Sequence, residues 1–182
     1  MHSTKVNYGI ESWKLKGRIN ELFMKDSAEL YDGAARHDIN SKVRKYALQK
    51  LAAFCRTAET GNYKSTIIDA CADDKAAEVR VFAMRMLENE PASIRALKSI
   101  TLNTEEASVK ERSAAITRLG ELGDSTLARE VSLMDPSYLV RAAAAKQLNN
   151  TEDLLYLIYT EGRSVRIAAA EKLALIAKAK RA

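Results

Sequence analysis

Apolar residues recur along the chain in five similar segments, each of which can be aligned on one leucine. The five leucines are Leu51, Leu87, Leu119, Leu148 and Leu173. An alanine stands four residues before each of them, at Ala47, Ala83, Ala115, Ala144 and Ala169. A valine stands eight residues before four of them, at Val43, Val79, Val140 and Val165, and Glu111 takes this place in the third segment. Because positions i, i+4 and i+8 share one face of an α-helix, the pattern predicts five helices, each with one apolar stripe.

Shorter helical segments are predicted between these five helices. Their apolar residues are spaced for a helix over residues 65–72, 92–102, 125–134 and 151–159. Pro91 precedes the second of them, and proline at a first helical turn is a start signal. No run alternates apolar and polar residues for long enough to predict a strand. We therefore predict an all-α chain that repeats a short helix, a turn and a longer helix, with 36, 32, 29 and 25 residues between the leucines.

An arginine stands seven residues before each leucine, almost in line with it on the helix. These arginines are Arg44, Arg80, Arg112, Arg141 and Arg166. A guanidinium that points into a core needs a partner. An acid stands six residues before four of them, at Asp38, Asp74, Glu106 and Asp135, whereas the fifth segment has Thr160 with Glu161 beside it. We expect carboxylates to neutralise these arginines inside the fold.

The repeated acid and arginine, together with residues 109–124, which end in Arg-Leu-Gly-Glu-Leu-Gly-Asp, resemble the HEAT-repeat family of paired-helix solenoids. Residues 135–143 and 151–155 are similar to leucine-rich-repeat-variant units, whose period is shorter. The resemblance covers residues 38–178. It implies a right-handed, armadillo-like α-solenoid of five or so helical hairpins. It also implies that the acids and arginines named above form a structural ladder between neighbouring repeats, and that the protein is an interaction scaffold.

Residues 1–37 fit the repeat poorly, and we interpret them as two capping helices. Trp13, Leu15, Ile19, Leu22 and Phe23 are spaced for one amphipathic helix, and residues 28–36 for a second one that Gly33 splits. A terminal repeat covers one open end of the core, so an atypical sequence is expected there. The predicted organisation is a single domain, with capping helices over residues 1–37 and the repeat array over residues 38–182.

The composition of the 182 residues, 47% hydrophobic and 29% charged, is typical of a folded domain. No apolar run approaches the roughly 20 residues of a membrane-spanning helix, and the first residues lack the apolar core of a signal peptide. Cys55 and Cys71 are too few for a disulfide framework or a four-cysteine zinc site. We therefore predict a cytoplasmic protein that binds no membrane. The net charge of +5 permits an anionic partner without demanding one.

Candidate catalytic residues are scarce. His2 and His37 are the only histidines, and a surface or capping role for His37 is favoured over a dyad with its neighbour Asp38. Asp73 and Asp74 precede a helix, where capping of free amides is favoured over metal ligation. No phosphate-binding loop, zinc-binding helix motif or serine elbow occurs. The sequence predicts no catalytic residue, no metal site and no cofactor.

One HEAT-like class that resembles this chain in being basic and helical is enzymatic, namely the alkylpurine DNA glycosylases, which use a cleft with aromatic residues and an acid. Trp13, Tyr46 and Phe82 could supply aromatic rings. Tyr46 and Phe82, however, occupy the same repeat position, five residues before the leucine, and this equivalence favours packing. The HEAT-like bilin lyases are another enzymatic class, and no local motif supports them here.

Cations recur on the outer side of the longer helices, near each leucine, where the helix turns away from its stripe. They are Lys50, Arg85, Arg118, Lys146 and Lys172, and Lys45, with Lys42, extends the series in the first segment. We call Lys45, Lys50, Arg85, Arg118, Lys146 and Lys172 the cationic row. If the helices stack in parallel, the row follows the concave face along which solenoids bind. The favoured function is a non-enzymatic scaffold for another protein with an acidic surface. Binding of a nucleic-acid backbone is the alternative, and the same residues also fit ordinary solvated helix faces.

Overall fold

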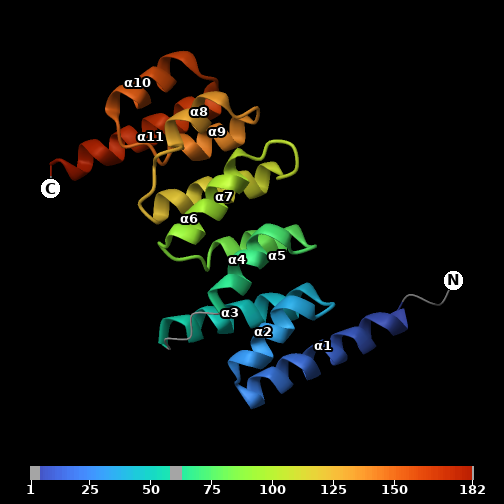
Figure 1. The fold of residues 1–182 in the computed structure, drawn as a ribbon. Coiled ribbons are helices and arrows are strands. Elements are labelled where there is room, and N and C mark those ends of the chain that lie inside the picture. The colour runs from blue at the N-terminus through green and yellow to red at the C-terminus, as the bar shows by residue number, and fades with distance from the viewer. Residues whose placement is uncertain (1–4, 58–62, 182) are drawn as a thin grey trace. The chain divides into compact units, whose positions relative to one another are not determined.

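The structure is a computed structural model that describes residues 5–57 and 63–181, with the side chains of residues 15–56 and 63–181. The described residues form eleven α-helices and no strand, which confirms the predicted all-α class (Figure 1). None of these helices is long and apolar enough to cross a membrane. The chain divides into two compact units, Met1–Leu87 and Glu88–Ala182, and each is described by itself.

Unit 1 is built from pairs of consecutive helices. Its helices are α1 (Lys5–Lys25), α2 (Ala28–His37), α3 (Ser41–Thr57), α4 (Tyr63–Asp73) and α5 (Ala77–Met84). Helix α2 packs on α3, α4 packs on α5, and α3 also contacts α5 and α1. The two helices expected in residues 1–37 are present as α1 and α2, but Gly33 does not split the second one. A glycine costs a helix only about 1 kcal/mol, and Tyr31 and Ala35, buried on either side of Gly33, hold α2 in place.

Unit 2 continues the pairing of helices. Its helices are α6 (Pro91–Leu102), α7 (Val109–Glu121), α8 (Ala128–Met134), α9 (Tyr138–Ala145), α10 (Thr151–Thr160) and α11 (Arg163–Ala179). The pairs are α6 with α7, α8 with α9, and α10 with α11. The second helices of the pairs also pack on one another in succession, α7 on α9 and α9 on α11. Pro91 lies in the first turn of α6, as its position in the sequence predicted.

The predicted apolar stripes form the core of each unit. All the stripe valines and alanines, together with the first four leucines, are at most 4% exposed. Leu173 is half-buried and packs against the core cluster of unit 2. Burial of one valine or leucine side chain contributes about 1.5–3 kcal/mol, so these stripes are the main apolar contribution to the stability of the helix pairs.

Two helices of the pattern end three residues before their leucine. Helix α5 is shorter than its partner α4, so the expected order of a short and then a longer helix is wrong for this pair, whereas α9 is one residue longer than its partner α8. The Met86 N–H donates to the Ala83 carbonyl at 2.8 Å, and a similar i→i+3 bond follows α9. This tighter turn ends the α-helix and still leaves Leu87 and Leu148 buried.

Glu111, the exception at the valine position, is 4% exposed and starts helix α7. Its carboxylate accepts hydrogen bonds from the Ser108 N–H, at 3.0 Å, and from the Ser108 hydroxyl. The Glu111 N–H in turn donates to the Ser108 hydroxyl oxygen at 3.3 Å. These reciprocal bonds form a capping box, so the third segment replaces one apolar contact with a helix-start motif.

Candidate interaction surface

Buried pairs of arginine and aspartate connect neighbouring helix pairs within each unit. Arg44 on α3 donates through Nε and Nη2 to the two carboxylate oxygens of Asp74, at 2.7 and 2.8 Å. Arg112 on α7 binds Asp135 in the same way, at 2.8 and 3.1 Å. All four side chains are at most 7% exposed. Two parallel bonds between planar groups fix the orientation as well as the distance of each pair.

Four arginines of the repeat also bind the turn that precedes their own helix. Nη1 donates to a main-chain carbonyl five or six residues earlier in four cases: Arg44 to Asp38, Arg80 to Asp74, Arg112 to Ala107, and Arg141 to Asp135. The aspartates in these turns accept the N–H two residues ahead through a carboxylate oxygen. Within a unit, Arg44 and Arg112 therefore each join the turn of one helix pair to the turn of the next.

The hydrogen bonds between Arg44 and Asp74 keep both side chains charged although they are buried. Burial raises the pKa of the Asp74 carboxyl, but hydrogen bonds from Arg44 and from the Ala76 N–H outweigh it and hold that pKa below its usual value. The hydrogen bond to Asp74 raises the pKa of the Arg44 guanidinium. Both groups therefore remain charged at neutral pH.

Two further pairs of this kind are more exposed. Arg141 donates to Glu161 at 3.2 Å, with side chains 22% and 18% exposed, so Glu161 supplies the carboxylate where the pattern has Thr160. Arg18, which the sequence did not single out, lies 3.3 Å from the carboxylate of Asp38. Arg18 belongs to α1, so this contact connects α1 to the turn before α3.

Two predicted members of the ladder lie at the surface. Glu106 is exposed, and its carboxylate accepts a hydrogen bond from the Asn103 amide at 3.3 Å. Arg166 is also exposed and has no ion pair among the described residues. The expectation that Arg166 is buried is therefore wrong. The reason is that nothing in the described chain covers this side of α11.

The residues of the cationic row lie in both units, and four of the six have partners. Three form ion pairs, Lys45 with Glu78 at 3.4 Å, Arg118 with Glu121 at 2.9 Å and Lys146 with Glu171 at 3.3 Å. Lys50 lies over the rings of Phe23 and Tyr46, with its Nζ 5.6 and 5.8 Å from their centres. Arg85 is exposed and Lys172 half-buried, and neither has an ion pair within the part of the chain that the structure describes. The positive charge of the row is therefore largely shared with neighbouring side chains.

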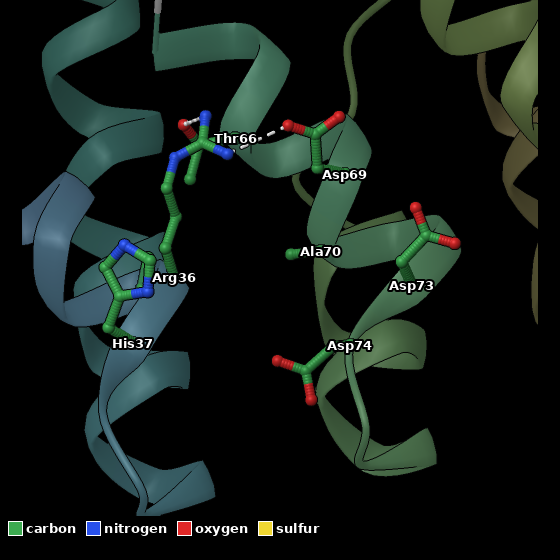
Figure 2. A pocket seen from close by; sticks show the side chains of 8 residues that line it. Arg36, His37, Thr66, Asp69, Ala70, Asp73 and Asp74 are labelled. Atoms are coloured by element: carbon green, nitrogen blue, oxygen red, sulfur yellow. Dashed lines mark hydrogen bonds and ion pairs between the residues drawn. The ribbon is translucent and has the colours of Figure 1, made fainter.

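A pocket of about 280 Å³ lies between α2 and α4 of unit 1 (Figure 2). Arg36 of α2 reaches across to α4 and donates to Asp69 at 3.0 Å and to the Thr66 hydroxyl. Asp32 accepts from both Arg36 and Thr66, which closes a network of four side chains. Burial lowers the pKa of Arg36, but the bonds to Asp69 and Asp32 outweigh it and raise that pKa. Arg36 is thus already neutralised and holds the two helices together.

The other polar groups of the pocket form no catalytic arrangement. Figure 2 shows His37 on the α2 side and Asp73 and Asp74 on the α4 side. Asp74 is bound by Arg44, and its carboxylate accepts the Ala76 N–H in the turn before α5, so it fixes this turn and does not cap a helical amide as expected. Within the described residues, no hydrogen bond joins His37 to a carboxylate, and no three metal-binding side chains are grouped closely enough to hold an ion.

Of the aromatic residues considered for a glycosylase-like cleft, the two whose side chains the structure describes are half-buried in the fold. The half-buried ring of Tyr46 lies edge-on to the fully buried ring of Tyr31, with 6.2 Å between the centres. Phe82 is half-buried on α5. Trp13 is outside the residues whose side chains are described, and His2 is outside the described residues altogether.

Comparison of the chain with protein-family models and with curated protein sequences finds no match.

Proposed function

We propose that this protein is a non-enzymatic scaffold that binds a partner protein, built as a right-handed α-solenoid of HEAT-like hairpins. The observation that carries the proposal is the repeated arginine ladder. In both units an arginine of one helix pair binds the acid in the turn of the next pair, through Arg44 and Asp74 in one and Arg112 and Asp135 in the other. A ladder of this kind holds successive pairs in a regular stack, and stacked pairs present an extended surface for binding.

The partial neutralisation of the cationic row favours a protein partner over a nucleic acid. Binding of a phosphate backbone draws its strength from many cations that exchange counterions for phosphates. Here Lys45, Arg118 and Lys146 already have carboxylate partners. A mixed surface of this kind matches a protein that offers both acidic and polar groups.

Arg85 and Lys172, the two cations of the row with neither an ion pair nor an aromatic partner among the described residues, give the sharpest test. The tagged full-length protein is used to isolate its partner from extracts of the source cells. The double variant R85Q/K172Q is expected to retain about tenfold less of that partner than the unmodified chain, because rim charges control capture and specificity. Titration calorimetry with the purified partner then measures the change in affinity.

A matched control removes two exposed cations outside the row. The variant R95Q/K110Q loses the same charge from α6 and α7 and is expected to bind the partner as well as the unmodified chain. Equal binding by both variants would remove the row from the proposal. Loss of the captured material on nuclease treatment would support the alternative, a nucleic-acid binder.

The cytoplasmic location is also a prediction. Cys55 and Cys71 do not form a disulfide with each other, which suits a reducing compartment. Microscopy of the tagged protein in its source cells tests this location directly.

A further inference from the structure

The outward side of α11 carries the residues that, on earlier helices, hold the next helix pair. The side chains of Arg163, Arg166, Ile167, Ala170 and Ala174 fall within about 100° of one another around α11. We call these five residues the open face of α11. All five are exposed, Ile167 to 46%.

The ladder position shows what this face lacks. Arg44, Arg112 and Arg141 each bind a carboxylate in the turn of the following helix pair. Arg166 is the equivalent residue of α11, and it has no such carboxylate within the described chain. It is therefore a ladder arginine without its acid.

The residue four positions after the ladder arginine also indicates that a covering helix pair is missing from α11. In α3, α7 and α9 this position is occupied by Leu48, Ile116 and Ala145, and each of these side chains is 0% exposed. Ala145 lies in the core cluster of unit 2 with residues of α10 and α11. Ala170 is the equivalent residue of α11 and is exposed. The same register that is covered on α3, α7 and α9 is thus uncovered on α11.

The charges around the open face select an acidic partner. Arg163, Arg166 and Lys178 are exposed cations on α11. The one acid of this helix, Glu171, is engaged by Lys146 at 3.3 Å. A partner that covers the face must therefore bring carboxylate groups, because an uncharged apolar partner would bury these cations without compensation.

In a second copy of this chain, the acids at the ladder positions are already bound. Asp38, Asp74, Asp135 and Glu161, which lie in the turns between paired helices, are each in contact with an arginine of their own chain. Glu106 is bound to Asn103 through its carboxylate. The chemistry therefore favours a different protein over self-association.

We propose that the open face of α11 binds a helical hairpin of a partner protein that carries an aspartate or glutamate in its turn and places it on Arg166. The apolar side of that hairpin covers Ile167, Ala170 and Ala174, as a following helix pair does elsewhere in the unit. This surface is separate from the cationic row, so it stands or falls independently of the proposed function.

Site-specific photocrosslinking tests the contact. The full-length chain with a benzoylphenylalanine in place of Ala170 is irradiated in an extract of its source cells, and crosslinked peptides are identified by mass spectrometry. The expected product joins position 170 to a helical segment of another protein next to an aspartate or glutamate. A chain labelled at Ala72, an exposed alanine of α4, is the matched control and is expected to give no such product.

Charge exchange then tests the pairing. The R166E variant is expected to bind the identified partner about 30-fold more weakly, and an arginine in place of the partner's acid is expected to restore the affinity. Glutamate is compatible with the first turns of α11, so the variant should fold. Crosslinks only within or between copies of this chain, the same product from Ala72, or unchanged affinity of R166E would each overturn the proposal.

Discussion

A single buried side chain, that of Arg112, shows how the fold tolerates a charge in its core. Its Nε and Nη2 donate to Asp135, and its Nη1 donates to the Ala107 carbonyl. All three guanidinium nitrogens therefore have an acceptor, and the charge has a counter-ion. An unpaired guanidinium at this depth would cost several kcal/mol.

The contribution of each ion pair to the free energy of unfolding should increase with its burial. The D135N variant keeps the size of the side chain but leaves Arg112 without a counter-charge, so the free energy of unfolding should fall by about 3–5 kcal/mol. In the matched variant E161Q, the partner of the half-buried Arg141 is neutralised, and the loss should stay within about 1 kcal/mol. Urea denaturation followed by circular dichroism measures both. Equal losses would mean that burial does not set the strength of these pairs.

At the scale of the element, the sequence predicted which segments are helical because the periodicity is local. It did not predict where α5 and α9 end, since their last turns tighten to i→i+3 bonds while Leu87 and Leu148 stay in the core. In the sequence pattern, Glu111 was only the exception at the valine position. The pairing of Glu111 with Ser108 had a sequence signal, the Ser-x-x-Glu of a capping box.

The start of α7 is stabilised by this capping box, and a serine substitution measures its contribution. The S108A variant removes the acceptor of the Glu111 N–H and one donor to the buried Glu111 carboxylate, so the free energy of unfolding should fall by about 1–2 kcal/mol. Ser137 occupies the same position before α9 but makes no side-chain cap. The S137A variant should therefore change stability by less than about 0.5 kcal/mol. The idea fails if thermal or urea unfolding ranks the two variants in the opposite order.

At the scale of the whole molecule, the spacing of the cationic row was readable in the sequence, but its electrostatic state was not. Lys45 and Lys146 are neutralised by Glu78 and Glu171, which lie 33 and 25 residues further along the chain. Those separations are close to the repeat length, so each pair joins one helix pair to the next. Only the packing of helices reveals these partners, because a count of charges records Glu78 and Glu171 as independent surface acids.

The net charge of +5 is therefore a poor guide to nucleic-acid binding, and this yields a prediction for the intact protein. In a mobility-shift assay, duplex DNA and single-stranded RNA should be retarded only at low salt. At about 150 mM salt the dissociation constant should exceed about 100 μM, because few cations of the row can exchange counterions for phosphates. R85Q/K172Q should reduce the low-salt binding most, since these two cations have no ion pair among the described residues. Tight binding that persists at about 150 mM salt, with a steep salt dependence, would instead establish the nucleic-acid alternative. A protein scaffold and a phosphate binder thus predict opposite results in one titration.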